Sequence, residues 1–465
     1  MASLSRQFAQ WVAGLRYEDL PPAVIDRAKG VTLQAITSVL IGSQSRAGQQ
    51  AVKLIADEEE GVRKGATIMV DGRKVTKGGA GFANSEMAFS GGKWDTFRML
   101  THPGTSIIPG ALVAAEATGA SGKDYITGVA AGYEVMERLA SDFIPTVMSR
   151  GFHAGPVFGI FGPAIAAAKM LRLDEDQVNS VIALCASLAS SNLEGARSGG
   201  RALREGAAVR NAMLAVALAQ QGHVGGETVL EGDAGFYHAY AGNNKGELTY
   251  SFVGDTHTSL DRIAAGLGKD WIFLETLYRI YSTAGYNIAH IAVTAQLCEE
   301  NNIRHQDVDR IEAVVNWLET QYPSPAFPVR REDRNDKPGS TAYHTAYGVV
   351  KRGFPVLNSW EKDQPREADP PEVLDLMQRV TIIPSHTMGL FAPRITLFTR
   401  DGKSYTRQGT GREFIWDYDG LTRRIREVAP GLPIPAAQYE EIIATCRELE
   451  RQDRADRLVR LTLKQ

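Results

Sequence analysis

The chain has 465 residues, of which 43% are hydrophobic and 23% charged, and 51 basic against 54 acidic side chains leave a formal net charge of −3. Such a composition is typical of a globular protein with two or three lobes, and it excludes a disordered chain, a collagen and a dedicated basic nucleic-acid binder. No apolar run approaches the roughly 18–20 residues that a membrane span requires, and the N-terminus lacks the apolar stretch of a signal peptide. We therefore expect a cytoplasmic protein that binds neither nucleic acid nor a membrane.

Helix patterns dominate the first half of the sequence. Pro22 and Gly42 bracket an apolar stretch that fits one helix, with proline in the first turn and glycine at the end. Asp71-Gly72 between short β-like runs indicates a hairpin over 64–76. The glycine-rich residues 77–106 are expected to form a long loop. Apolar, alanine-rich helices that should be buried are then predicted over 106–120, 122–141, 155–171, 174–192 and 203–222.

The pattern changes after about residue 270. Residues 311–322 and 394–410 favour β-strands, and the second run holds Asp401-Gly402 at the centre of a hairpin. A proline- and charge-rich connection over 319–340 separates them, and helix returns from about 434. The sequence predicts a mainly α fold whose three parts are a large all-helical domain over 1–270, a smaller α+β lid domain over 271–410, and a C-terminal segment over 411–465 that returns to the helical domain.

Metal and cofactor signatures are missing from the sequence. The three cysteines lie far apart, and no two histidines are close enough in sequence to suggest a metal pair. The glycine clusters do not follow a strand with the spacing of a dinucleotide loop. We expect neither a metal nor a cofactor.

Two histidines occur in similar contexts. His102 precedes a proline and the start of an apolar helix, and His153 precedes a Gly-Pro turn and another apolar helix. A histidine held at a helix N-terminus can act as an acid or a base, and the helix dipole there favours an anionic substrate group. The alternative for each is a structural histidine bonded to nearby backbone.

An arginine-rich segment precedes the last of these helices. Arg201 and Arg204 could bind carboxylates through bidentate hydrogen bonds. The alternative is surface charge, or pairing with Glu194 and Glu205.

At these three segments the chain resembles the MmgE/PrpD family, and the resemblance covers nearly the whole sequence. It rests on FANSEMAF, THPGTSIIPGALVAAEATGASGKDYITGVAAGYEVMERL, GFHAGPVFGIFGPAIAAAKML and REGAAVRNAMLAVALAQQGHVGGETVLEGDAGF. The resemblance implies a large helical domain with a smaller α+β lid, usually in a homodimer, and a metal-free site between the domains. It also implies acid–base chemistry on small di- or tricarboxylates, in which a proton moves at carbon next to a carboxylate. Such chemistry needs positioned acids and bases, and cations that stabilise the developing charge.

Only some of the family's motif residues occur in this sequence. His102 matches the histidine of the family's H-P-[GS] motif, His153 that of its G-F-H motif, and Thr96 the threonine that precedes the first motif. The resemblance implies that His102 and His153 form the acid–base pair and that Thr96 contacts substrate.

Several positions depart from the family pattern. The motif A-N-G-x-x-x-H-x-x-D-x-D-D-T has Phe89 at its histidine, and Gly92 and Trp94 at its first two aspartates. The family's K-x-L-H-x-G has Arg201 at the lysine and Arg204 at the histidine. Arginine keeps the positive charge but cannot act as a base, so both are expected to bind substrate carboxylates.

The lid carries the remaining expected contacts. The family's K-x-Y-P-x-C-x-x-T-H segment has Arg279 at the lysine and Ile288 at the histidine, and His290 could fill the histidine's place through a local insertion. Tyr343 or His344 stands at the tyrosine of the family's S-L-P-Y motif. We expect substrate contacts from His290, Tyr343 and His344.

The leading hypothesis is a cofactor-independent lyase, either a dehydratase or a decarboxylase, that acts on a small polycarboxylate. The first alternative is an isomerase or epimerase, which needs the same proton transfer but no leaving group. The second is a non-catalytic carboxylate-binding protein that has kept the fold. In each case the expected partners are a small polycarboxylate and a second copy of the chain.

Overall fold

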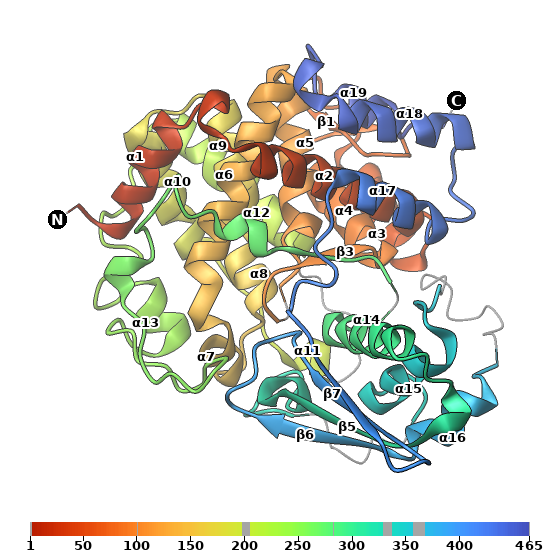
Figure 1. The fold of residues 1–465 in the computed structure, drawn as a ribbon. Coiled ribbons are helices and arrows are strands. Elements are labelled where there is room, and N and C mark those ends of the chain that lie inside the picture. The colour runs from red at the N-terminus through yellow and green to blue at the C-terminus, as the bar shows by residue number, and fades with distance from the viewer. Residues whose placement is uncertain are drawn as a thin grey trace.

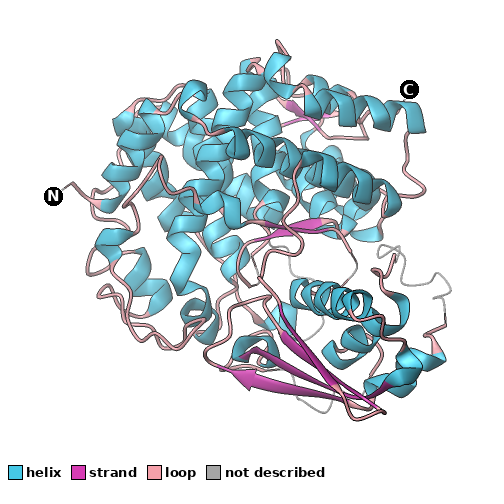
Figure 2. Ribbon diagram, in the orientation of Figure 1, coloured by secondary structure: helices cyan, strands magenta, loops and turns pink. Residues whose placement is uncertain are grey.

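The computed structural model describes residues 2–99, 101–197, 205–281, 283–328, 337–356 and 368–464. Most of the chain is helical, and the longest strands gather in a smaller lobe at one side of a large helical lobe (Figures 1 and 2). The mainly α fold with a smaller α+β part is thereby confirmed. No helix in the described ranges is long and apolar enough to cross a membrane.

The helical lobe is built mainly from the first half of the chain. Its helices are α1 (Leu4–Gly14), α2 (Pro22–Gly42), α3 (Arg46–Glu59), α4 (Lys77–Gly91), α5 (Gly104–Thr118), α6 (Gly122–Ala140), α7 (Ile144–Ser149), α8 (Ala154–Gly159), α9 (Phe161–Met170), α10 (Glu175–Leu188), α11 (Glu194–Arg197), α12 (Glu205–Gln220) and α13 (Phe236–Ala241). Two short antiparallel ribbons accompany them: β1 (Ala66–Thr67) with β2 (Lys74–Val75), and β3 (Trp94–Thr96) with β4 (Leu277–Arg279).

The α+β lobe contains α14 (Gly285–Glu300), α15 (Thr341–Lys351), α16 (Pro371–Met377) and a four-stranded sheet. The sheet has the order β6 (Val380–Ser385), β5 (Val308–Asn316), β7 (Arg394–Thr399) and β8 (Ser404–Gln408). Strand β6 pairs with β5 in parallel, whereas the other pairs are antiparallel. Gly402 has a φ of 83° at the turn between β7 and β8, where the sequence predicted a hairpin.

The chain finally runs back along the helical lobe. Helices α17 (Tyr418–Glu427) and α18 (Ala436–Arg447) both pack against α2, and α19 (Arg457–Arg460) lies beside α5. The Tyr439 hydroxyl is 2.8 Å from Thr37 Oγ1, and both residues are buried. Residues more than 400 positions apart in sequence thus share one core.

Helix α4 corrects the prediction of a loop over residues 77–106. Its glycines permit close packing between helices: a Cβ on Gly81 would lie 2.6 Å from Val209 Cγ1 of α12, and one on Gly91 would lie 1.9 Å from Ser38 O of α2. The Thr76 side chain caps the helix by accepting a hydrogen bond from the Gly79 amide. Tertiary packing therefore outweighs the low helix propensity of glycine. The predicted helix over 155–171 is likewise two helices, α8 and α9, which meet at Ile160.

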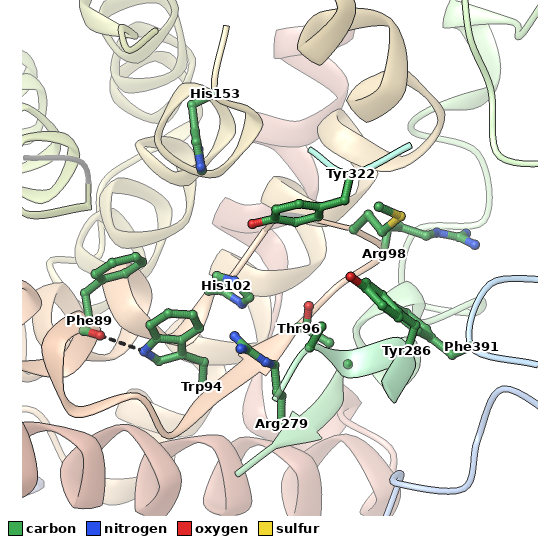
Figure 3. Close-up of a pocket in the computed structure, with 13 residues that line it drawn as sticks. Phe89, Trp94, Thr96, Arg98, His102, His153, Arg279, Tyr286, Tyr322 and Phe391 are labelled. Atoms are coloured by element: carbon green, nitrogen blue, oxygen red, sulfur yellow. Dashed lines mark hydrogen bonds between the residues drawn. The ribbon is translucent and has the colours of Figure 1, made fainter. Parts of the chain in front are cut away.

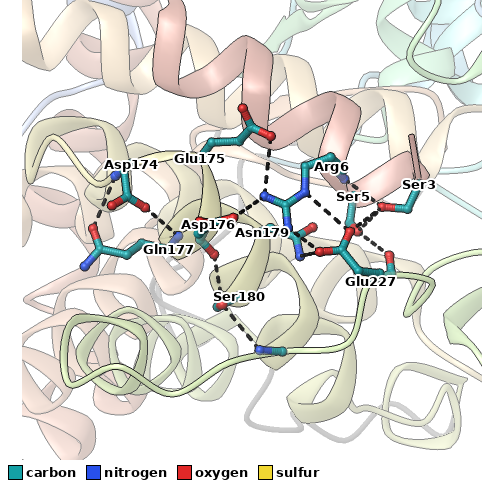
Figure 4. A network of polar contacts seen from close by, with 11 residues as sticks. Ser3, Ser5, Arg6, Asp174, Glu175, Asp176, Gln177, Asn179, Ser180 and Glu227 are labelled. Atoms are coloured by element: carbon teal, nitrogen blue, oxygen red, sulfur yellow. Dashed lines mark hydrogen bonds and ion pairs between the residues drawn. The ribbon is translucent and has the colours of Figure 1, made fainter. Parts of the chain in front are cut away.

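Arg6 anchors the N-terminal helix to the rest of the lobe (Figure 4). Its guanidinium group contacts Asp176 Oδ1 at 2.6 Å and Glu175 Oε1 at 3.4 Å, both at the start of α10, and also pairs with Glu227. A shared cation between three carboxylates holds α1 against α10, although each contact at the surface contributes little alone.

Candidate active site

A cavity of about 450 Å³ opens beside the β3–β4 ribbon, next to α14 (Figure 3). Residues far apart in sequence line it: Phe89, Trp94, Thr96, Arg98, Met99, His102, His153, Arg279, Ala284, Gly285, Tyr286, Tyr322 and Phe391. The sequence predictions His102, His153 and Thr96 thus share one cavity.

The β3–β4 pairing decides which side chains reach the cavity. Trp94 pairs with Arg279, and Asp95 pairs with Tyr278. Successive side chains of a strand point to opposite faces, so Trp94, Thr96 and Arg279 face the cavity whereas Asp95 and Tyr278 are buried in the helical lobe.

Asp95 holds the loop that carries His102. Both of its carboxylate oxygens accept a hydrogen bond from the Gly104 amide at 2.9 Å, and the Tyr133 hydroxyl donates to Oδ2 at 2.5 Å. Burial raises the pKa of the Asp95 carboxyl to about 6, while the bonds from Tyr133 and Gly104 act in the opposite direction.

The backbone carbonyl of Asp95 also orients the His102 side chain. Its Nδ1 lies 2.8 Å from the Asp95 carbonyl oxygen. Because a carbonyl can only accept, Nδ1 carries the hydrogen, and Nε2 is the basic nitrogen of the neutral ring. The Trp94 ring packs against the imidazole at a centroid distance of 4.5 Å.

His153 comes from another wall of the cavity. It is buried, immediately precedes α8, and points toward the cavity from the side opposite Arg279 (Figure 3). A Cβ on Gly155 would lie 3.0 Å from His153 Cε1 and 3.1 Å from Glu205 Oε1, so a carboxylate borders the imidazole. Glu205, the first residue of α12, is itself buried.

Arg279 is a cation without a carboxylate partner in the described part of the chain. Its Nε donates to the Thr283 carbonyl at 2.6 Å, and its guanidinium carbon lies 4.6 Å from the centroid of the Trp94 ring. Desolvation lowers its pKa. Arg98 lines the same cavity but is paired with Glu275 at 3.0 Å. Arg279 is therefore the described lining residue best suited to bind an anion.

A second cavity, of about 700 Å³, adjoins the first and shares Arg279, Ala284 and Tyr286 with it. The predicted contacts Tyr343 and His344 line this second cavity. The Tyr343 hydroxyl donates to Asp369 Oδ1 at 2.8 Å, and His344 Nδ1 lies 2.8 Å from the Ser340 carbonyl. Burial lowers the pKa of His344 to about 4, so the ring is neutral near pH 7.

The other predicted contacts lie elsewhere. His290 is fully buried and lines neither cavity; its Nδ1 is 2.8 Å from Thr345 Oγ1 and its Nε2 is 4.0 Å from Glu319 Oε2. Burial lowers the pKa of His290 to about 3 and raises that of Glu319 to about 8. Arg201 and Arg204 lie outside the described residues.

Sequence reasoning gave no role to the aromatic wall of the cavity, and it left Arg279 out of the expected contacts. Arg279 could have been found, because it stands at a lysine of the family pattern. Tyr322 and Phe391 carry no such signal, since each reaches the cavity from a separate loop of the α+β lobe. Among the described residues, no cluster of three histidine, cysteine or acidic side chains could hold a metal ion.

Taken together, the fold and the cavity define a class: mainly α-helical proteins whose smaller α+β lobe helps to enclose two histidines and an arginine. The chain belongs to the MmgE/PrpD family, because the family's N-terminal domain model matches residues 6–249. This result confirms the resemblance seen in the sequence.

Its curated relatives are named as decarboxylases. A cis-aconitate decarboxylase-like protein, oryM, of Aspergillus oryzae is 26% identical over 298 residues, which cover 61% of this chain and 59% of that protein. The cis-aconitate decarboxylase of Aspergillus terreus (strain NIH 2624 / FGSC A1156) is 24% identical over 437 residues, or 87% of this chain and 84% of the relative. The human cis-aconitate decarboxylase is 27% identical over 287 residues, 58% of each chain.

Proposed function

We propose that this chain is a cofactor-independent lyase that acts on a carbon atom next to a carboxylate, in a small di- or tricarboxylate. The observation that carries the proposal is the arrangement of His102, His153 and Arg279, which has no carboxylate partner among the described residues, around one cavity. The decarboxylase names of the relatives support the lyase class.

In this proposal Arg279 binds the carboxylate of the substrate. His102 Nε2 removes the proton from the adjacent carbon, and the electron pair moves into the carboxylate, where the guanidinium stabilises the added negative charge. In a dehydration, His153 gives a proton to the leaving hydroxyl. In a decarboxylation His102 removes no proton: the electron pair of the breaking bond to CO₂ stays on the substrate, and His153 gives a proton to the carbon atom that receives it. Thr96 contacts the substrate from β3.

The remaining predicted contacts complete the proposal. Tyr343 and His344 bind the substrate from the second cavity, Arg201 and Arg204 add further carboxylate contacts, and His290 supports the wall between α14 and α15. The active form is a homodimer.

An isomerase or epimerase is the second candidate. It is favoured by the positions of His102 and His153 on different walls of the cavity, because one can remove a proton and the other can return it to the opposite face of the carbon (Figure 3).

The test is proton exchange in D₂O, followed by NMR with citrate, cis-aconitate, itaconate, malate and aspartate-derived diacids. We expect exchange or product formation that falls at least about 100-fold in His102→Gln and His153→Gln, since general acid–base groups contribute on that scale. His223→Gln, at an exposed histidine, is the matched control and should behave as the unaltered protein. A new product identifies a lyase and exchange alone an isomerase. If binding occurs without exchange or product, the chain is a carboxylate-binding protein and the lyase proposal is wrong.

A further inference from the structure

Aromatic side chains form much of the wall of the site cavity. Phe89 and Trp94 form one side, and Tyr322, Tyr286 and Phe391 form the other (Figure 3). The rings of Phe89 and Trp94 are stacked, with centroids 4.6 Å apart and an interplanar angle of 21°. The Trp94 indole N–H donates to the Phe89 carbonyl at 2.9 Å, so its only polar hydrogen is used within the wall.

The Phe89–Trp94 side of this wall is a poor partner for carboxylates, whereas Tyr286 and Tyr322 on the other side carry hydroxyls that can donate a hydrogen bond. The faces of aromatic rings carry negative electrostatic potential, and carbon surface offers no hydrogen bond to replace the lost hydration of an anion. Two arginines are among the described lining residues. Arg98 is paired with Glu275, and Arg279 is the last residue of β4. The Arg279 end of the cavity therefore suits a carboxylate, whereas the Phe89–Trp94 side suits an apolar group.

The size of the cavity also indicates a substrate with both a carboxylate and an apolar group. Its volume of about 450 Å³ falls in the range of pockets that enclose drug-sized ligands, about 300–1,000 Å³. A small dicarboxylate that is held by Arg279 and reached by His102 and His153 would fill only part of this volume, and the dispersion energy of the ring surfaces that it leaves uncovered would be lost.

We infer that the substrate is a carboxylate that also carries an apolar substituent, an aryl or branched alkyl group, packed between Phe89–Trp94 and Tyr322. The inference rests on the proposed function, because it takes the same cavity as the carboxylate site. It narrows the substrate class from small polycarboxylates to substituted ones.

Calorimetric titration of the full-length protein with two probes, succinate and benzylsuccinate, tests this inference. The probes differ only by the benzyl group. We expect benzylsuccinate to bind at least about tenfold more tightly, since burial of an aromatic ring stabilises a complex on that scale. Phe89→Asn should lower the ratio of the two affinities to below about threefold, whereas Phe89→Leu should retain most of the gain. A circular-dichroism spectrum and a urea unfolding midpoint close to those of the unaltered protein show that each variant has folded.

Arg279→Gln separates this inference from the proposed function on which it rests. It should weaken the binding of both probes by a similar factor. If it does so while both probes bind the unaltered protein equally, the apolar substituent is excluded and the carboxylate site remains. If Arg279→Gln changes neither affinity, or neither probe binds, the proposed carboxylate site is wrong and the inference falls with it.

Discussion

At the scale of single residues, Asp95 links the helical core to the chemistry without facing the cavity. Its side chain fixes Gly104 and Tyr133, and its carbonyl fixes His102. Strand alternation allows one residue to do both, because the carboxylate points into the core while the backbone stays beside the site.

Asp95→Asn therefore tests a positioning role. Asparagine has one acceptor oxygen, so either the Gly104 amide or the Tyr133 hydroxyl loses its partner in a buried place. We expect the free energy of unfolding to fall by about 1–3 kcal/mol. The turnover number should fall while substrate affinity changes little, because Arg279 is untouched. Urea unfolding and steady-state kinetics measure the two effects. Asp255→Asn, at an exposed site, is the control; loss of affinity with unchanged turnover would contradict the role.

At the scale of secondary-structure elements, the contact between α2 and α4 depends on glycine. In Gly91→Ala the added carbon would lie 1.9 Å from Ser38 O, and the backbone of α2 cannot yield as a flexible side chain can. We expect a loss of about 1–3 kcal/mol or more in the free energy of unfolding. Gly226→Ala is the matched control, since a Cβ there has no atom within 4 Å. Equal stability of the two variants in urea would show that the helices separate easily.

The two helices of this contact, α2 and α4, show which elements could be predicted from the sequence and which could not. Helix α2 was predictable because its signals, Pro22 and Gly42, are local. Helix α4 was not, because the atoms that require its glycines belong to Ser38 and Val209, which lie far away along the chain. The site divides in the same way. His102 and His153 stand in local motifs, whereas Phe391 and Tyr322 reach the cavity only through the folding of the α+β lobe.

Glu319 and His290 connect three elements behind the cavity wall. His290 lies on α14 and contacts Thr345 of α15, and Glu319, in the 3-10 turn Trp317–Thr320, accepts a hydrogen bond from the Phe391 amide at 2.9 Å. The nearby titratable group His344 contributes to the lowered pKa of His290. Because burial raises the pKa of Glu319 from 4.5 to about 8, the folded protein keeps this proton when the unfolded chain has lost it.

Glu319 therefore makes stability depend on pH. Its stabilising contribution is fully present below pH 4.5, declines as the pH rises, and is lost once the pH passes about 8. Glu319→Gln cannot ionise, so its free energy of unfolding relative to the unaltered protein should rise between pH 5 and pH 8.5. Urea unfolding at the two pH values measures this difference. The exposed Glu299→Gln on α14 should show no such trend, and a flat response from Glu319→Gln would mean that the carboxyl is ionised in the folded protein.

At the scale of the whole molecule, α14 joins the two hydrophobic cores. Ile288 and Ala289 belong to the core of the helical lobe, whereas Val293, Leu297 and Cys298 belong to that of the α+β lobe. Leu318 and Phe391, from the α+β half of the chain, also pack into the first core. A continuous helix is cooperative, so one half of α14 cannot easily unfold while the other stays packed.

This coupling predicts a single thermal transition for the whole chain. Val31→Ala in the first core and Val308→Ala in the second each remove buried methyl groups, at a cost of about 1–3 kcal/mol. In differential scanning calorimetry each variant should move the same single peak to lower temperature, because neither core can unfold without breaking α14. Two resolved peaks, with Val308→Ala moving only one of them, would show that the lobes unfold independently. In that case Tyr286, at the start of α14, would have to be held in the cavity wall by the helical lobe alone.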